Sequence, residues 1–514
     1  MSALHRSLRS TLVAGIGITS LALLTACSPP DTGNGRGGEG DGGSTRLTVA
    51  ETTAPSTLDP QRSGLFADRF AWQLSYECLM STTAEGEVKP GLATEYTLSD
   101  DRTEYTFTLR EGVTFHNGDS LDADDVVYSF ERLSESPDRF DTELFPTLSH
   151  VEKVDDMNVK FVLDSPDAGF VNNMGNPLVW GCSIMSASSA DDNLATQMIG
   201  TGPWAQTAYE PETSLTFERN DEYWGEKTKA EELSLLYIPN MGTQVSNLKA
   251  GNVDIIFPDQ GSVEELKGDG FTVDNVHTDS TIFLQINNTK APFDDERVLK
   301  AMALAFDRQE LADQAYGGAA QPSGYLPPSL AWAPKVSDLP NHTQDSERAK
   351  ELLAEAGHAD GLDLSLIYIN GYDPGTNDLL AIMQKQLGDA GFNVTLEPLE
   401  AAVWSATRGD LGVYELSWNA QSYYANPYQY VAPVPGRQGE VPASLQTLID
   451  EAWNAASEEE YQSALSAVAT HEAEIVYPTI TLLARDMFVA YEAGVQGIDI
   501  PSSQSRTFLS QVTK

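Results

Sequence analysis

The sequence has little cysteine, few basic residues and few long apolar runs. Three Cys in 514 residues exclude a fold built on a network of disulfides. Lys and Arg total 31 against 76 Asp and Glu, which gives a formal net charge of −45. Such a surface repels phosphate backbones and anionic lipid headgroups, so binding to nucleic acid and attachment to a membrane through a basic patch are both excluded. After residue 45 no stretch approaches 18 uninterrupted apolar residues, so no membrane-spanning helix is predicted there.

What the sequence does contain is enough chain for a large folded protein. Hydrophobic residues make up 41% and charged residues 21%, both ordinary for a globular protein. A length of 514 residues corresponds to roughly three domains. We therefore expect a large, acidic, globular protein whose core needs no disulfide or metal for its stability.

Residues 1–26 have the organisation of a secretory signal peptide. Basic residues precede an apolar run from about Leu12 to Leu24, which is shorter than the roughly 20 residues of a transmembrane helix. The run ends in the sequence Leu-Thr-Ala-Cys27, which resembles the bacterial lipobox, in which the Cys is diacylated and becomes the mature N-terminus. Residues 27–45 are rich in Gly and predict a flexible tether. We expect a chain anchored by lipid at Cys27 to the extracytoplasmic face of the cell membrane; the alternative is a secreted protein in which Cys27 is incidental.

From residue 46 onward, strand and helix patterns alternate. Period-2 patterns predict strands over residues 46–51, 105–110, 281–286, 362–368 and 393–397. Helical spacing predicts helices over residues 123–133, 296–306, 346–356, 377–387 and 457–475. Gly357 and Gly388 are expected to end the third and fourth of these helices. The alternation predicts an α/β protein with a mixed or parallel sheet.

Several short motifs are each explained by local structure. The sequence Phe-His116-Asn-Gly118 joins a predicted strand to a helix, so His116 is expected to be a hydrogen-bonded structural residue and not a metal ligand. Asp124 and Asp125 lie in the first turn of a predicted helix, where carboxylates complement the helix dipole.

The same motifs, taken together and in order, carry a family resemblance. They include Thr57-Leu-Asp-Pro60, Tyr76-Glu-Cys-Leu79, Lys89-Pro-Gly-Leu-Ala93, Tyr105 to Gly118, Ala123 to Phe130, Gly200-Thr-Gly-Pro-Trp204, Asn287 after a strand, and Ala349 to Gly357. This series resembles the signature of extracytoplasmic solute-binding protein family 5, the peptide and nickel receptors of ABC importers. The resemblance covers essentially the whole chain from residue 46 to the end.

The resemblance implies an α/β, two-lobed periplasmic-binding-protein-like fold (type II, cluster C) with an inserted subdomain in lobe one. Lobe one would comprise residues 46–78, 196–285 and 480–514, the inserted subdomain residues 79–195, and lobe two residues 286–479. Two chain crossings between the lobes would form a hinge, and a ligand that contacts both lobes would favour the closed form. The resemblance further implies a monomer that delivers its solute to permease subunits, makes or breaks no bond and needs no cofactor.

The segment from Trp404 to residue 430 is the most informative about the ligand. Many peptide-binding relatives have a motif of the form Trp-x-Ala-Asp-Tyr, whose Asp holds the ammonium group of the peptide, and this chain has Trp418-Asn419-Ala-Gln421-Ser instead. A neutral amide at the Asp position removes a charge-assisted hydrogen bond. Some relatives also have an Arg three residues before the Trp, where this chain has Glu415. Both departures argue against ordinary peptides with free ends, although Glu415 or another acid could still serve.

Other residues are implied in ligand binding by their position or their chemistry. The aromatic and amide side chains of Trp404, Trp418, Asn419, Tyr423, Tyr424 and Asn426 suit apolar peptide side chains and sugar faces equally. Arg408 lies near a position that contacts ligand in relatives, and Thr53 follows the first predicted strand. Each could instead have a structural role, as a core ring or as an exposed, ion-paired Arg.

Cys78 and Cys182 could form a disulfide in an oxidising exterior. The sequence does not fix the distance between them, so the bonded and the free states both stay open.

The leading functional hypothesis is a lipid-anchored substrate-binding receptor of an ABC importer, with an oligopeptide as its expected solute. An oligosaccharide or another uncharged solute is the alternative, and nickel comes third because the seven His form no spaced cluster. A sensor of a peptide signal fits the sequence equally well. A secreted hydrolase does not, because the sequence contains neither Gly-x-Ser-x-Gly nor His-Glu-x-x-His.

Overall fold

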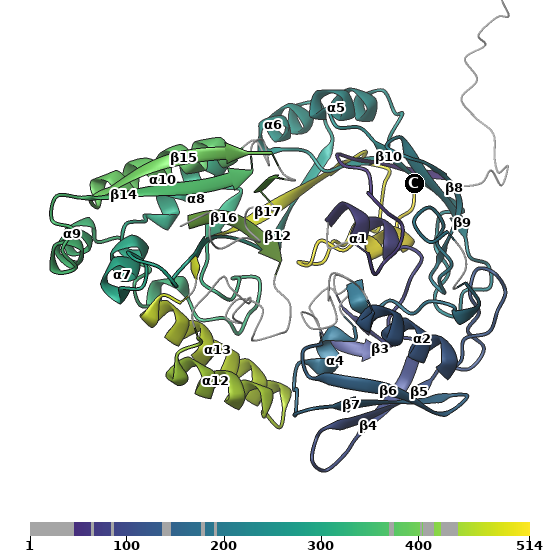
Figure 1. The fold of residues 1–514 in the computed structure, drawn as a ribbon. Helices are drawn as coiled ribbons and strands as arrows, with labels where there is room; N and C mark the ends of the chain where they lie inside the picture. The colour runs from purple at the N-terminus through teal and green to yellow at the C-terminus, as the bar shows by residue number, and fades with distance from the viewer. Residues whose placement is uncertain are drawn as a thin grey trace, which may run out of the picture. The chain divides into compact units, whose positions relative to one another are not determined.

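The computed structural model describes residues 46–514 apart from residues 63–65, 84–86, 136–144, 176–179, 190–192, 370–374, 401–402, 405–415, 423–439 and 478. Eleven strands of this part form one mixed sheet, and two further sheets have four and two strands. Helices alternate with the strands along the chain (Figure 1). The predicted α/β fold class is therefore confirmed.

The large sheet contains both parallel and antiparallel neighbours. In spatial order its strands are β15 (Phe392–Leu399), β14 (Leu362–Ile369), β16 (Leu416–Ser422), β12 (Thr272–Ile286), β17 (Thr479–Tyr491), β11 (Ile255–Ile256), β1 (Arg46–Glu51), β10 (Glu232–Tyr237), β9 (Ser214–Arg219) and β8 (Trp204–Glu210), with β13 (Ala320–Pro322) pairing with β17 outside this order. β1 runs parallel to β10 and β11, and β14 runs parallel to β15 and β16. The long strands β12 and β17 pair with each other along most of their length near the middle of the sheet.

The four-stranded sheet follows the order β4 (Ala93–Leu98), β5 (Glu104–Leu109), β7 (Asn158–Leu163) and β6 (Leu148–Asp155), and β2 (Met80–Thr82) pairs with β3 (Val88–Pro90). Buried residues alternate along β5 and β7, so these strands turn one face to a core. The helix α2 (Ala123–Ser134) packs its Phe130 against Phe161 of β7, with ring centroids 4.8 Å apart.

The remaining α-helices are α1 (Phe66–Trp72), α4 (Phe170–Asn173), α5 (Met241–Lys249), α6 (Gln260–Gly268), α7 (Glu296–Leu304), α8 (Arg308–Tyr316), α9 (Ser346–Glu355), α10 (Thr376–Asp389), α12 (Ala443–Trp453) and α13 (Glu458–Ile475); the 3-10 helices are η1 (Trp180–Cys182), η2 (Ala187–Ser189), η3 (Val336–Asp338) and η4 (Arg506–Ser510). Part of the acidic excess has a local use here. An Asp side chain accepts a backbone N–H of the first turn at Asp122, Asp259, Asp295, Asp307 and Asp345.

Two large apolar cores lie at the two ends of the β12–β17 pair. One contains Trp204 of β8 and Val489 of β17, together with residues of β1, β9 and β10. The other contains Ile282 of β12 and Leu483 of β17, together with residues of α7, α9 and α10. Because β17 contributes to both cores, the chain passes from one core to the other within this strand.

Several predicted boundaries differ from the structure, and packing or strand pairing explains two of the differences. The helix predicted to end at Gly388 continues to Asp389, because Leu387 and Ala390 are buried and keep the last turn in place; Gly391 takes the positive φ of 98°. The strand predicted from residue 281 begins at Thr272, since the polar stretch before it pairs with β17. The predicted helices that begin at residues 123, 296 and 346 are confirmed, and α13 begins one residue after its Ser457 cap.

Candidate functional site

The segment predicted to bind the ligand forms strand β16, next to the central strand β12. In the antiparallel register Asn419 lies opposite Phe283, Gln421 opposite Thr281, and Ser422 opposite Ser280. On its other side β16 pairs with β14 only at Leu416 and Ser417. Among the described residues, no strand pairs with the outer edge of residues 418–422. Among the described strands, residues 418–422 therefore pair with β12.

β12 has an irregularity beside the end of β16. His277 lies opposite Asp486 and Thr281 opposite Ala484, so residues 278–280 face the single residue Arg485. The Thr278 hydroxyl donates a hydrogen bond of 2.5 Å to the carbonyl of Arg485, and the backbone N–H of Asp279 donates to the carbonyl of Ser502. The bulge lies between the two apolar cores, where the chain passes from one to the other. β16 thus ends beside the place where the two cores connect.

Two of the predicted site residues near β16 are buried. The Asn419 side chain donates to the carbonyl and to the hydroxyl of Ser417, at 3.2 and 3.4 Å. Trp404 packs against Ile367, which lies opposite Ser417 in the register of β14 with β16. The structure therefore brings Trp404 to the start of the predicted motif. Neither contact involves a ligand, so the binding roles of Asn419 and Trp404 stay predictions.

Thr53 is exposed and follows the end of β1 at Glu51. The order of the sheet places β12, β17 and β11 between β16 and β1. For Trp418 and Gln421 the structure describes the backbone in β16. Arg408, Glu415, Tyr423, Tyr424, Asn426 and the lipobox Cys27 lie outside the described residues.

A buried ion pair fixes the end of β1, and the sequence analysis missed it. Arg506 of η4 donates to the Glu51 carboxylate at 2.6 Å. Its guanidinium lies 4.0 Å from the ring centroid of Phe70 and 3.6 Å from that of Phe257. The partners are 455 residues apart, so no local pattern in the sequence could have indicated the pair.

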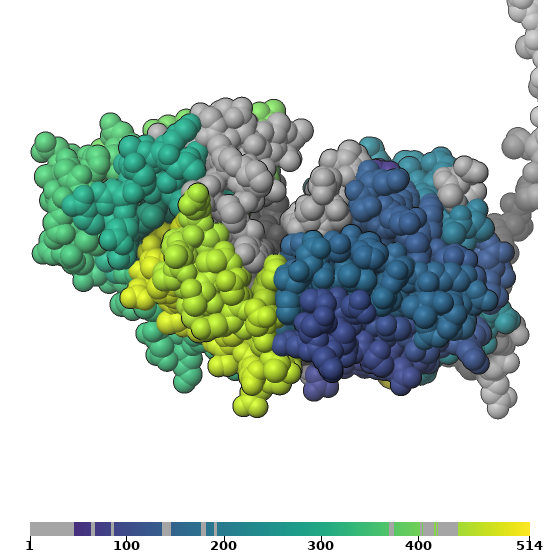
Figure 2. Space-filling model, turned by 60° about the horizontal axis from the view of Figure 1, so that its bottom comes forward, coloured from purple at the N-terminus to yellow at the C-terminus, as the bar shows by residue number. Residues whose placement is uncertain are grey.

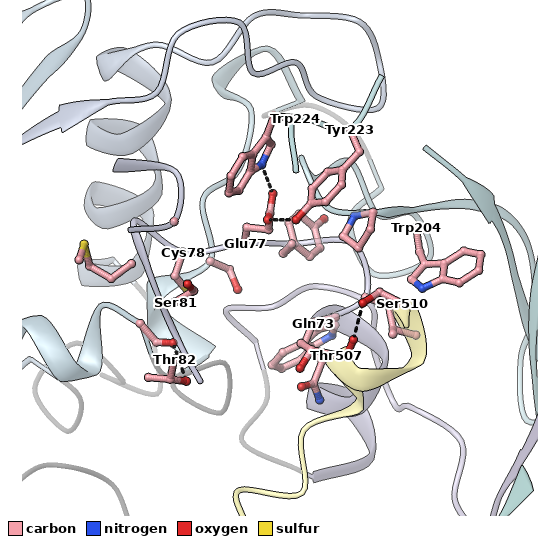
Figure 3. A pocket seen from close by; sticks show the side chains of 18 residues that line it. Gln73, Glu77, Cys78, Ser81, Thr82, Trp204, Tyr223, Trp224, Thr507 and Ser510 are labelled. Carbon is pink, nitrogen blue, oxygen red and sulfur yellow. Dashed lines mark hydrogen bonds between the residues drawn. The ribbon is translucent and has the colours of Figure 1, made fainter. Parts of the chain in front are cut away.

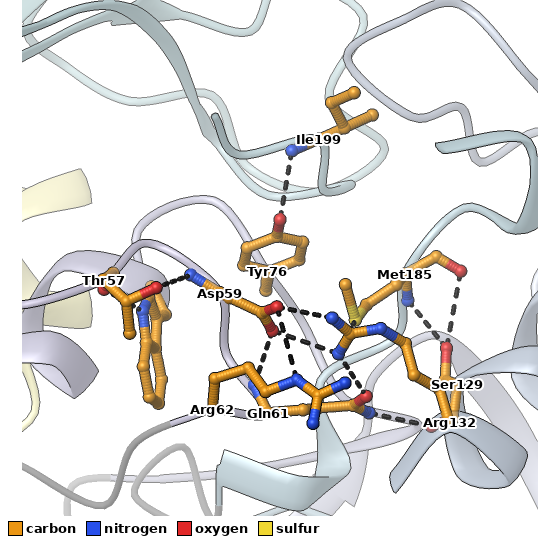
Figure 4. A network of polar contacts seen from close by, with 10 residues as sticks. Thr57, Asp59, Gln61, Arg62, Tyr76, Ser129, Arg132, Met185 and Ile199 are labelled. Carbon is orange, nitrogen blue, oxygen red and sulfur yellow. Dashed lines mark hydrogen bonds and ion pairs between the residues drawn. The ribbon is translucent and has the colours of Figure 1, made fainter. Parts of the chain in front are cut away.

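The motif Thr57-Leu-Asp-Pro60 connects β1 to α2 through a polar network (Figure 4). Arg132 of α2 donates to both oxygens of the Asp59 carboxylate and, at 2.8 Å, to the Gln61 side-chain oxygen. The Gln61 amide donates in turn to the carbonyl of Ser129 at 2.8 Å. Asp59 and Gln61 are both buried. The motif therefore has a structural role in holding the segment after β1 against α2.

Two further sequence expectations concern local structure. The His116 ring is within 2.9 Å of the Gly202 carbonyl, and burial lowers the pKa of His116; this is the structural role that the sequence predicts. Cys78 and Cys182, which the sequence left either bonded or free, are joined by a disulfide with their Cα atoms 5.1 Å apart.

The turn between β4 and β5 contacts the end of α12. Arg102, which has a φ of 62°, donates from Nη1 to the Asn454 carbonyl at 2.7 Å and from Nη2 to the Ala455 carbonyl. Nearby, the backbone N–H of Ala168 donates to the carbonyl of Trp453 at 3.1 Å. At the C-terminal end of a helix, the backbone carbonyls receive no hydrogen bond from the helix itself, so these contacts supply donors for the end of α12. Figure 2 shows α12 and α13 meeting the part of the chain that carries the four-stranded sheet.

The described residues contain neither a cluster suited to a metal ion nor a helix suited to a membrane. No group of three or more His, Cys, Asp or Glu among them is placed to hold a metal ion. None of the helices in that part is long and apolar enough to cross a membrane.

Comparison with known proteins identifies the family. Residues 87–439 match the model of the bacterial extracellular solute-binding proteins, family 5. Di/tripeptide-binding protein 2 of Pseudomonas aeruginosa is 31% identical over 388 residues, 69% of this chain and 72% of the relative. Heme-binding protein A of Haemophilus influenzae is 28% identical over 68% of this chain and 69% of the relative.

Solved structures share the fold. The periplasmic binding protein DppA from Helicobacter pylori, in complex with the peptide STSA, superposes with a TM-score of 0.78 at 23% identity, over 91% of this chain and 98% of that chain. NikZ from Campylobacter jejuni, in complex with Ni(L-His), superposes with a TM-score of 0.76 at 18% identity, over 91% of this chain and 99% of that chain. The two-lobed fold is thus shown, and the named relatives are binding proteins. The chain belongs to the bacterial extracellular solute-binding proteins of family 5.

Proposed function

We propose that this protein is the substrate-binding lipoprotein of an ABC importer, and that it captures an oligopeptide between its two lobes and delivers it to the permease. The family assignment supports the receptor role, and the name of the di/tripeptide-binding relative supports a peptide as the solute. The observation that carries the peptide proposal is the strand pairing of residues 418–422 in β16, which among the described strands runs through β12.

An extended peptide would add to the side of β16 that faces away from β12. Residues of a strand with one free edge have backbone N–H and C=O groups that a second extended chain can pair with. Such pairing forms hydrogen bonds with the backbone of a peptide, so the side chains of the peptide can vary. Gln421, at the position of the ammonium-binding Asp of relatives, offers no charge to a free N-terminus. We therefore expect affinity to depend little on a charged peptide N-terminus.

Capture would proceed by closure at the β12 bulge. We place the crossing between the lobes at residues 278–280 and Arg485, because Ile282 and Leu483 already belong to the second core. This crossing lies a few residues from the lobe boundaries that are expected from the sequence after residues 285 and 479. The contacts of Arg102 and Ala168 with the end of α12 would hold the subdomain of residues 79–195 against lobe two in the closed form.

The lipid anchor belongs to the same proposal. Cys27 would carry the lipid, and residues 28–45 would give the lobes freedom to reach a permease in the same membrane. The chemistry of acyl chains, and not the acidic surface, would hold the protein at the membrane.

A thermal-shift panel tests the proposal. The full chain carrying Cys27→Ser is stripped of any bound ligand and mixed with short peptides, the same peptides N-acetylated, oligosaccharides, or nickel with and without chelator. A ligand at a hundred times its dissociation constant stabilises by about 2.7 kcal/mol. We expect free and acetylated peptides to raise the melting temperature equally. A rise in melting temperature with sugars alone would show that the protein is a carbohydrate receptor and not a peptide receptor. No rise with any solute would refute the receptor role.

A further inference from the structure

A cavity of about 230 Å³ lies beside α1 and η4 (Figure 3). Its walls come mainly from three parts of the chain that are far apart in sequence: residues 72–82, residues 203–224 and residues 507–510. No residue predicted to contact the solute lines it. One water takes up about 30 Å³ in the liquid, so the cavity has room for roughly seven waters or for one ring-sized molecule.

The lining is aromatic and carries no free charge. Trp72, Trp204, Tyr223 and Trp224 contribute ring surface. Glu77 is the one ionisable carboxylate or basic group among the lining residues, and its oxygens already accept three hydrogen bonds. The donors are Thr201 at 2.8 Å, Tyr223 at 2.8 Å and Trp224 at 2.9 Å. An anionic ligand would find no counter-charge here, and the Glu77 carboxylate is already bound by three donors of the wall, so the cavity suits a neutral molecule.

Two buried donors in the lining have no acceptor among the described residues. They are the Gln73 side-chain N–H group and the Trp204 indole N–H. Trp204 is fully buried and Gln73 is 8% exposed. The Gln73 amide cannot be turned round, because its oxygen accepts hydrogen bonds from the Ser505 hydroxyl and from the backbone N–H of Arg506. Buried donors without an acceptor are costly, and an incoming oxygen acceptor would relieve that cost.

From this combination we propose a second ligand site in lobe one, separate from the solute site at β16: the cavity binds a neutral, ring-sized molecule that carries a carbonyl or hydroxyl oxygen. Its ring lies against the aromatic walls, and its oxygen accepts from Trp204 or Gln73 after a small adjustment of these side chains. The site does not depend on the identity of the transported solute.

The test compares three probes that share a six-membered ring. Cyclohexanone carries an acceptor, methylcyclohexane carries none, and the cyclohexylammonium ion carries a positive charge. Each is added to the full chain with Cys27→Ser, labelled with nitrogen-15, so that the indole N–H signals of the eight Trp are observed. The Trp204 signal is assigned by its loss in Trp204→Phe. Cyclohexanone is expected to shift this signal and to raise the melting temperature, and the other two probes are expected to do neither.

Two variants separate this cavity from the surface. Ser510→Phe fills the cavity from η4 and is expected to abolish the shift, whereas Thr207→Phe, on an exposed position of β8, is expected to leave it unchanged. A crystal soaked with cyclohexanone gives a second readout that does not rely on Trp204→Phe folding. The proposal is overturned if cyclohexanone leaves the Trp204 signal in place, if the shift survives Ser510→Phe, or if the soaked cavity holds only water.

Discussion

Arg102→Ala is expected to weaken solute binding without touching the solute. In the structure Arg102 reaches from the β4–β5 turn to the carbonyls of Asn454 and Ala455 at the end of α12. If these bonds hold the closed form, their loss shifts the equilibrium towards the open form, and the affinity falls by the same factor.

The magnitude follows from the two hydrogen bonds. A net hydrogen bond contributes about 0.5–1.5 kcal/mol, and the contact is partly exposed to solvent. Two such bonds give about 2 kcal/mol, which corresponds to a decrease in affinity of roughly 30-fold. Arg102→Lys keeps the charge but cannot contact both carbonyls in the same way, so an intermediate loss is expected.

Isothermal titration calorimetry with the tightest ligand of the thermal-shift panel measures the affinity, and small-angle X-ray scattering measures the distribution between open and closed forms without ligand. Arg348→Ala is the matched control, because Arg348 is an exposed Arg of α9 whose ion pairs with described residues are those with its helix neighbours Glu351 and Glu355. An Arg102→Ala protein that binds and closes as the wild type does would refute the reasoning.

Four other substitutions follow from the described contacts or from the sequence. Burial raises the pKa of Glu472 to about 8 from an ordinary value of 4.5. The folded chain therefore holds this proton more tightly than the unfolded chain, and the wild type loses stability as the pH rises from 4.5 to 8. Glu472→Gln is expected to be more stable than the wild type by up to about 4 kcal/mol at about pH 9 and nearly equal at about pH 4, as measured by urea unfolding. Asp59→Asn leaves Arg132, whose side chain is only 16% exposed, without its carboxylate and is expected to lower the free energy of unfolding by about 3 kcal/mol in the same assay, whereas an unchanged value would show that the pair is dispensable. Cys78→Ser with Cys182→Ser opens a loop with a sequence separation of 104 and is expected to cost about 2–5 kcal/mol under oxidising conditions, with no difference from the wild type under reducing conditions. Cys27→Ser in the producing cell is expected to move the protein from the membrane fraction to the soluble fraction; a protein that stays at the membrane would contradict the lipid anchor.

Local features of the fold were predictable from the sequence because their causes are local. The Asp-rich start of α2 and the helix face of Val126, Phe130 and Leu133 lie within twelve residues of one another, and the helix forms where they predict it. The helix predicted over residues 457–475 likewise forms as α13, with Glu458, Glu459 and Glu460 in its first turn. The end of α10 was not predictable in this way, because Gly388 is tolerated in a helix whose last turn is held by the buried residues Leu387 and Ala390.

The site was predictable only in part, because its contacts join distant segments. The motif of residues 418–422 identified β16, but its register with β12 depends on strands more than a hundred residues away. The pairs Glu51–Arg506 and Arg102–Asn454 join residues separated by 455 and 352 positions. No spacing in the sequence indicates such contacts, since they form only when the sheet and the two cores have been assembled.

Hydrogen–deuterium exchange of the backbone N–H groups of residues 418–422 tests the central claim most directly. It is measured on the full chain with Cys27→Ser, with and without the peptide that gives the largest thermal shift. The peptide is expected to slow exchange in β16, because its extended backbone pairs with the side of the strand that faces away from β12. A peptide that binds tightly and leaves exchange in these residues unchanged would show that it does not pair with β16.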